Sequence, residues 1–125
     1  MKKDIRIEPL HGNVSVNIKI TGLIGAGYYL DVFEKNSNNV VFSYSGTNVF
    51  DYDDMRVLPN SSDMNLGRVL MLNTTVVSID DNQDEEKKFT IRLQIIQNGN
   101  IVDEAVISDK IKKQHKNFLT LVKLI

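Results

Sequence analysis

The chain has 125 residues, no cysteine and a formal net charge of -1 at pH 7. A chain of this length can bury enough surface to fold without disulfides, and we expect one domain spanning residues 1–125. The lack of cysteine excludes disulfides, thiolate zinc sites and cysteine nucleophiles, and the near-neutral charge gives no general attraction to nucleic acid.

The N-terminal segment favours a cytoplasmic protein. Met1, Lys2 and Lys3 lead into alternating Ile5 and Ile7 rather than into the apolar core of a signal peptide. No segment approaches the roughly 18 consecutive apolar residues of a membrane-spanning helix. A mature exported fragment with a new Met1 would have the same appearance; otherwise we expect a soluble protein with no membrane partner.

Apolar residues recur mostly at every second position, which is the spacing of a strand with one buried face. The clearest case is the 14–20 segment, where Val and Ile alternate with Ser, Asn and Lys. The expected strands are 5–7, 14–20, 28–32, 40–44, an irregular one within 49–58, 69–79, 89–97, 100–108 and 118–125. This pattern predicts an all-β protein, a two-sheet antiparallel β-sandwich of eight or nine strands that is Ig-like or jelly-roll-like, with a closed barrel as the alternative.

The third and fourth strands are expected to form a hairpin across the turn-rich run Lys35–Asn39. A five-residue loop would place Val32 opposite Phe42 and Leu30 opposite Tyr44, so that apolar residues share one face. A four-residue loop would oppose Val32 to a serine. We therefore favour the five-residue loop.

The 69–79 segment is long and rich in β-branched residues, but its apolar positions change parity between Leu72 and Val77. Two arrangements would explain the change: both faces of the strand are covered, or a bulge near Asn73–Thr75 shifts the register. Either one predicts a central or bent strand.

The last hairpin turns on Asn98-Gly99, a pair that suits the positive φ angles of a two-residue turn. Uniform alternation from this turn places Ile95 opposite Val102 and Ile91 opposite Val106, because opposed residues share a face. The dry face is expected to consist of Phe89, Ile91, Leu93, Ile95, Val102 and Val106.

Glu104 is the unusual carboxylate of this hairpin, since the same register places it opposite Leu93 on the apolar face. A charge on a dry face needs a partner. An open sheet margin or a bulge near Glu104 is the favoured explanation, and a buried functional carboxylate is the alternative.

The acidic run that follows the 69–79 segment offers oxygen ligands of the kind that Ca²⁺ prefers. Asp80, Asn82 and Asp84 reproduce the opening spacing of a calcium loop, but the sixth position is not glycine and the twelfth is Ile91. Calcium binding would need a second acidic loop nearby, for which the carboxylates of the 51–54 segment are available. The alternative is a solvated turn.

Other motifs lack the context that their chemistry requires. The glycine run Thr21–Gly27 carries Leu30 where a dinucleotide fingerprint needs its third glycine, and it favours a tight loop between strands. The basic run Lys110–Lys116 has no interleaved aromatic residue or arginine, which argues against nucleic acid as a partner. No spacing of histidine, serine or carboxylate residues predicts a catalytic centre, and we expect no enzyme activity and no cofactor.

Two features favour a role in protein contacts. Tyr29 and Phe33 are expected to point away from the interior. The apolar C-terminal strand, with Phe118, Thr120 and Val122, would be open to strand addition if it forms an uncovered edge. The sequence therefore predicts a non-enzymatic binding, adaptor or structural subunit that contacts a protein partner or a copy of itself. The alternative is a carbohydrate- or calcium-dependent ligand-binding module.

Overall fold

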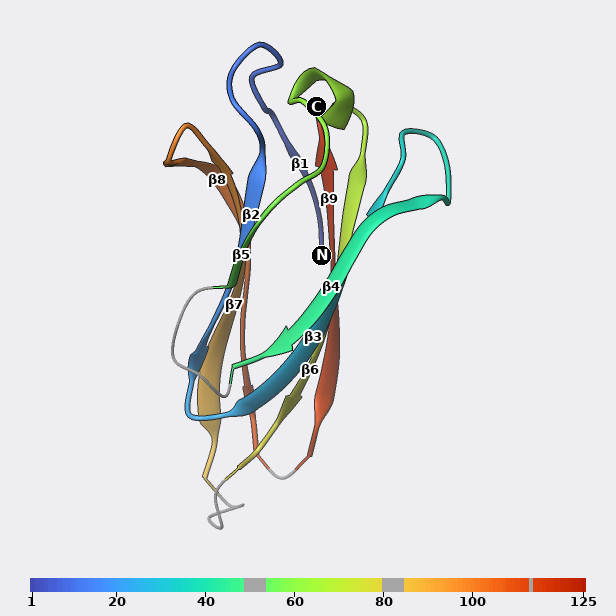
Figure 1. Ribbon diagram of the computed structural model, residues 1–125. Helices are drawn as coiled ribbons and strands as arrows, with labels where there is room; N and C mark the ends of the chain where they lie inside the picture. Colours follow the sequence, from blue (N-terminus) through green and yellow to red (C-terminus); the bar gives the residue numbers. More distant parts are fainter. Residues whose placement is uncertain (49–53, 80–84, 113) are drawn as a thin grey trace.

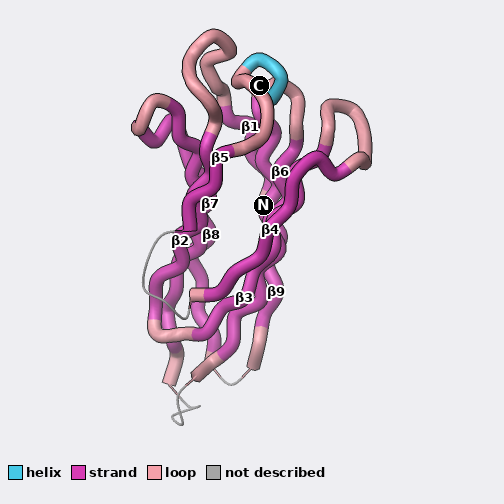
Figure 2. The backbone as a smooth tube through the Cα atoms, viewed as in Figure 1, coloured by secondary structure: helices cyan, strands magenta, loops and turns pink. Residues whose placement is uncertain are grey.

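The computed structural model describes residues 1–48, 54–79, 85–112 and 114–125, and in this part of the chain nine strands form two packed sheets (Figures 1 and 2). The strands are β1 (Lys2–Ile5), β2 (Ser15–Gly22), β3 (Gly25–Phe33), β4 (Val40–Thr47), β5 (Asp54–Val57), β6 (Val69–Val77), β7 (Lys87–Gln97), β8 (Asn100–Ile111) and β9 (Lys116–Leu124). A single 3₁₀ turn, η1 (Asp63–Asn65), precedes β6. No helix among the described residues is long and apolar enough to cross a membrane.

The strand order is β1-β9-β6-β3-β4 in the five-stranded sheet and β5-β2-β7-β8 in the four-stranded sheet. These two sheets confirm the predicted all-β sandwich. Neighbouring strands run antiparallel, except that β1 pairs with β9 in parallel and thereby joins the first strand to the last.

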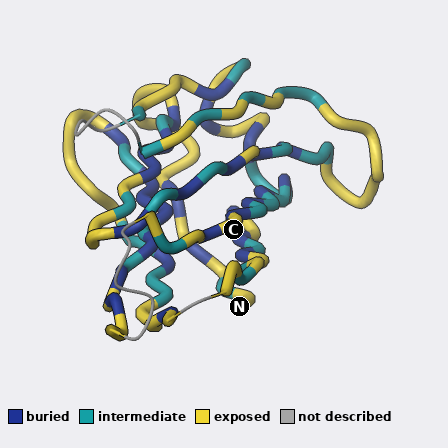
Figure 3. The backbone as a smooth tube through the Cα atoms, turned by 90° about the horizontal axis from the view of Figure 1, so that it is seen from below, coloured by how far each residue is buried: buried dark blue, intermediate teal, exposed yellow. Residues whose placement is uncertain are grey.

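The core lies between the sheets, where alternate residues of each strand meet. Figure 3 shows buried and exposed residues alternating along the strands. In β7 the inward residues Phe89, Ile91, Leu93 and Ile95 are buried as predicted. They pack with residues of the facing sheet such as Leu30, Val32, Leu70, Leu72 and Val122, which are also buried.

The β3–β4 hairpin has the predicted register up to Val32, beyond which a β-bulge pairs Phe33 with Val40. Val32 lies opposite Phe42 and Leu30 lies opposite Tyr44. Asn36, within the connecting loop, adopts a positive φ of 52°, which asparagine tolerates better than most residues.

The β7–β8 hairpin has the predicted turn but not the predicted register. Asn98 and Gly99 have φ angles of 53° and 75°, as a tight primed turn requires. A β-bulge then shifts the pairing between Ile95 and Ile96, so that Ile95 opposes Asp103 and Val102 becomes the extra residue. The expected Ile95–Val102 pair is therefore wrong.

This bulge exchanges the two faces of β8. Val102 is 41% exposed, and the inward positions belong to Ala105 and Ile107 instead of Val106. Glu104 lies opposite Gln94 on the outer face rather than opposite Leu93. The bulge thus removes the apparent charge from the apolar face, as the favoured explanation of Glu104 required.

Strand β6 is central, but neither explanation of its parity change is correct. Its register with both β3 and β9 is continuous, so no bulge interrupts it. Thr74 occupies a buried inward position, and Val77 points to the exposed outer face. A threonine at an inward position, together with an apolar residue left exposed, produced the pattern.

Arg68 lies fully buried at the end of the sandwich where β6 begins. Its guanidinium donates to both carboxylate oxygens of Glu34, at 3.1 and 3.0 Å, and to the side-chain oxygens of Asn60 and Asn65. The guanidinium also donates to the Pro59 carbonyl at 3.3 Å. One cation therefore ties the end of β3 to the 59–65 loop, and a bidentate pair of this kind is geometrically specific.

The hydrogen bonds from Arg68 lower the pKa of Glu34 from 4.5 to about 2. A carboxyl with a depressed pKa contributes stability above its unfolded pKa and loses it as the pH falls toward the folded value. We expect Glu34→Gln to reduce the free energy of unfolding at pH 7 and to have progressively less effect between pH 4.5 and pH 2.

Urea unfolding of wild type and Glu34→Gln at a series of pH values measures this difference. Glu8→Gln is the control, because the exposed Glu8 carboxylate has no cation partner among the described residues. A constant stability difference between wild type and Glu34→Gln across this pH range would contradict the assignment.

Candidate functional site

The outer face of the five-stranded sheet carries Tyr29, the most exposed aromatic side chain among the residues that the structure describes. Tyr29 on β3 lies beside Asn73 on β6, which in turn lies beside Leu119 on β9. Tyr29 is 51% exposed and Leu119 is 43% exposed. The outward orientation of Tyr29 follows from the inward orientation of Tyr28 and Leu30, because successive strand residues alternate.

A recess of about 300 Å³ lies next to the Tyr29 ring. Its lining comprises Tyr29, Asn73, Thr74, Thr75 and Asn117. Thr75 Oγ1 donates to Asn117 Oδ1 at 2.7 Å, and Gly27, opposite Thr75, has open space where a side chain would lie. The recess therefore combines an aromatic ring with amide and hydroxyl groups.

Phe33 lies on the same face, as predicted, but it is not adjacent to Tyr29. It pairs with Val69 and Val40 near the end of β3, and Asp31 lies between the two aromatic residues on that face. Phe33 is half-buried. The two residues thus belong to one surface without forming one cluster.

The C-terminal strand is not an edge. Strand β9 pairs with β1 on one side and with β6 on the other. Thr120 and Val122 are buried inward residues, and Phe118 packs edge-on against Phe89 with ring centroids 5.4 Å apart. The expectation that Phe118, Thr120 and Val122 line an uncovered edge is therefore wrong, because the first strand of the chain covers it.

The calcium candidates Asp80, Asn82 and Asp84 lie outside the described residues, as do Asp51 and Asp53. Asp54, the described member of the second acidic segment, is already engaged by Tyr28 and Arg56. Among the residues that the structure describes, no group of three or more histidine, aspartate or glutamate side chains is arranged to hold a metal ion.

Asp54 belongs to a polar cluster on the side of the sandwich where β4 and β5 lie. The Tyr28 hydroxyl donates to Asp54 Oδ2 at 2.5 Å, and Arg56 Nε donates to Asp54 Oδ1 at 3.1 Å. The Arg56 guanidinium lies 4.7 Å from the centre of the Tyr44 ring. Burial and the Asp54 charge raise the pKa of Tyr28 and Tyr44 above the ordinary value, so both hydroxyls stay protonated. The hydrogen bond from Tyr28 to Asp54 is suited to holding β5 against β3.

A hydrogen-bonded chain crosses the outer face of the four-stranded sheet. Asn17 donates to Gln94 at 2.9 Å, and Gln94 donates to Glu104 at 2.9 Å. Arg92 donates to the other Glu104 oxygen at 2.6 Å. Glu104 is thus fully paired on the surface, where it contributes to cross-strand contacts.

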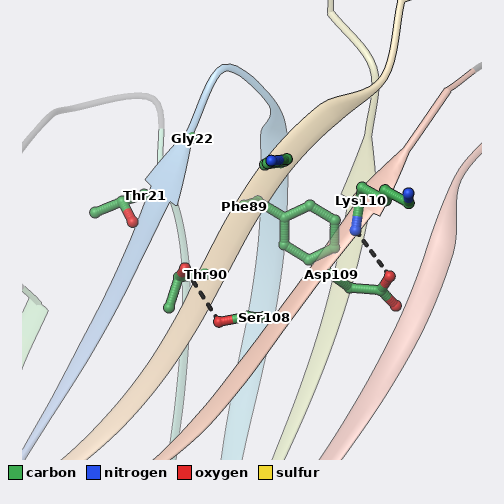
Figure 4. A pocket seen from close by; sticks show the side chains of 8 residues that line it. Thr21, Gly22, Phe89, Thr90, Ser108, Asp109 and Lys110 are labelled. Carbon is green, nitrogen blue, oxygen red and sulfur yellow. Dashed lines mark hydrogen bonds between the residues drawn. The ribbon is translucent and has the colours of Figure 1, made fainter.

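An open depression of about 510 Å³ lies where β2, β7 and β8 approach one end of the sheet (Figure 4). The hydroxyls of Thr21, Thr90 and Ser108 line it together with Lys88 and Lys110. Lys110 Nζ pairs with Glu86 at 3.2 Å. This part of the basic run is therefore balanced locally by an acidic residue.

Arg68 and Asn65 were not identifiable as core residues from the sequence. Both lie in or next to a turn-rich polar stretch, yet both are buried. Asn65 donates to the carbonyls of Pro59 and Ser61, which orders the loop around the guanidinium. The only feature of the sequence that could have indicated this buried site is the position of Arg68, a lone arginine between a polar loop and a strand rich in β-branched residues.

Gly46 and Gly27 provide a test of the β4–β5 cluster. A Cβ at Gly46 would approach the Tyr28 hydroxyl oxygen to 2.6 Å and Asp54 Oδ2 to 2.9 Å, whereas a Cβ at Gly27 would meet nothing within 4 Å. We expect Gly46→Ala to destabilise the fold by about 1–3 kcal/mol through overpacking. Gly27→Ala should be neutral or stabilising by up to about 1 kcal/mol, because it restricts the unfolded chain.

Denaturant unfolding of both variants measures the difference. Tyr28→Phe, which removes the hydroxyl that Gly46 accommodates, should largely relieve the defect of Gly46→Ala when the two changes are combined. Equal stabilities of Gly46→Ala and Gly27→Ala would show that the tight contact at Gly46 is relaxed at no cost.

No protein family, no curated protein and no solved structure that we compared with the chain matches it. Its function has to be inferred from the arrangement of its own residues.

Proposed function

We propose that the protein is a non-enzymatic binding domain that contacts a protein partner through the outer face of the five-stranded sheet. The observation that carries this proposal is the set of apolar side chains left exposed there. Tyr29 and Leu119 are exposed, and Met71 and Leu121 lie half-buried beside them. Protein interfaces typically place aromatic and apolar residues at their centre.

The surroundings of this patch support the same role. Lys2 flanks Leu121, Asp31 flanks Met71, and Asn117 flanks Thr75. An apolar centre with charged and polar residues around it is the usual anatomy of a contact surface that must stay soluble when unoccupied.

Three ion-paired carboxylates support a binding role over catalysis. Glu34 pairs with Arg68, Asp103 with Lys3, and Glu104 with Arg92. Each of these pairs joins segments that lie far apart in the sequence or on neighbouring strands, and so has a structural role. A general acid or base would instead need to reach a substrate.

The recess beside Tyr29 favours carbohydrate as a second candidate ligand. An exposed aromatic ring can stack on the apolar face of a sugar, and amide and hydroxyl groups can hydrogen-bond to its hydroxyls. Asn73, Thr75 and Asn117 supply these groups next to the ring. Leu119 does not line the recess, so substitutions can separate the two candidates.

Affinity capture from the source cells with the immobilised domain tests the protein-binding proposal. We expect Leu119→Ser and Tyr29→Ser each to weaken retention of one partner about tenfold, as is typical at the centre of an interface. Ile101→Ser is the control, because Ile101 is 56% exposed on the other sheet. Capture of the same proteins by all four forms would contradict the proposal.

A glycan array with the same proteins tests the carbohydrate candidate. A sugar ligand in the recess predicts that Tyr29→Ser abolishes binding, because the stacking ring is lost, while Leu119→Ser leaves binding intact. The absence of any bound glycan, or equal binding by the Tyr29→Ser variant, would argue against carbohydrate.

A further inference from the structure

Strand β8 is an edge whose outward backbone groups are capped by side chains at two points. Asp103 Oδ1 accepts from the Glu104 amide at 2.8 Å, and Lys3 Nζ donates to the Glu104 carbonyl at 2.7 Å. Asp109 Oδ1 accepts from the Lys110 amide at 2.8 Å, and Lys116 Nζ donates to the Lys110 carbonyl at 3.4 Å. Of the outward positions between these two points, Val106 and Ser108 are uncapped, but charged capping side chains flank them at both ends and disfavour the addition of another strand.

The edges formed by β1 and β5 are protected by their length and charge. Each strand has four residues. Strand β1 carries Lys2, Lys3 and Asp4, and β5 carries Asp54 and Arg56. Short, charged edge strands are a common protection against unwanted pairing.

Strand β4 has neither form of protection. It spans eight residues and contains no charged side chain, and beyond a bulge at Val41 the six residues Phe42–Thr47 pair regularly with β3. The Asn48 amide donates to the Ala26 carbonyl at 3.1 Å. This bond shows that the backbone groups of Asn48 face β3. Because backbone groups alternate in direction along an antiparallel strand, those of every second residue of β4 point toward β3, and those of Ser43 and Ser45 point away from it. Among the described residues, no side chain caps these outward groups.

We propose that a second copy of this chain pairs with β4, so that two β4 strands run antiparallel about a two-fold axis and join the two five-stranded sheets. A two-fold pair satisfies the open edge of both copies at once and leaves no further edge to extend the assembly. The strand carries no charge, so a second copy meets no like charge along it. The outward residues Ser43 and Ser45 are small and can form cross-strand hydroxyl pairs.

This edge is distinct from the outer face around Tyr29 and Leu119, and the proposal does not depend on that face. Pairing through β4 would leave both outer faces open and place them side by side on one continuous sheet. A dimer could therefore bind a partner through two copies of the contact surface.

Sedimentation velocity between about 1 and 500 μM protein tests the proposal. We expect a reversible dimer for the wild type, and Ser45→Pro should raise its dissociation constant at least about tenfold, because proline removes an outward amide donor. Ser108→Pro is the matched control, since Ser108 occupies an outward position on the β8 edge. Circular dichroism checks that both variants stay folded, and Ser45→Lys replaces Ser45→Pro if proline unfolds the strand.

A monomeric wild type throughout this range, or a dimer that Ser45→Pro and Ser45→Lys leave unchanged, would overturn the proposal. The chain has no cysteine of its own, so introduced thiols report the pairing directly. A short thiol cross-linker should join Ser45→Cys to itself or to Ser43→Cys in a mixture of the two variants. It should not join Ser108→Cys to itself, and a cross-link there with none at β4 would assign the dimer to the other edge.

Discussion

The apolar interior between the two sheets would be open to water along both long sides of the sandwich. Polar side chains from both sheets close these two sides. On one side Lys3 of β1 reaches Asp103 of β8 at 3.0 Å. On the other side Tyr28 of β3 binds Asp54 of β5. The bulge at Val102 is part of this closure: it turns Asp103 inward toward Lys3 and moves Glu104 outward to Arg92.

Local sequence signals predicted nine strands, both hairpins and the register of β3 with β4 up to Val32, because turn residues and period-two alternation act over a few residues. They placed the first strand at 5–7, whereas β1 spans Lys2–Ile5. They failed at the bulge, since a turn fixes the register only as far as the first irregularity. Val102 and Val106 are apolar, so the wrong register also satisfied the alternation. The one feature of the sequence that indicated the bulge was Glu104, because the uniform register placed its charge on the apolar face.

The position of the candidate surface was predictable in part. The loop between β3 and β4 determined that Tyr29 faces outward, but nothing in the alternation indicates which strands lie at the edges of a sheet. Strand β9 is internal because β1 pairs with it over a very long sequence separation. Asn73 and Asn117 reach the side of Tyr29 through two other long-range pairings, of β6 with β3 and of β6 with β9, which single-sequence patterns do not encode.

The parallel pairing of β1 with β9 has a consequence for how the protein is made. The Met1 amino group bonds to the Leu119 carbonyl across 118 positions of the chain. On the ribosome the first strand must therefore wait, unpaired, until almost the whole of this chain has been synthesised. Strand β6 likewise lacks one neighbour until then. During translation both strands expose backbone that other nascent chains could pair with, and this sheet depends on completing its last step quickly.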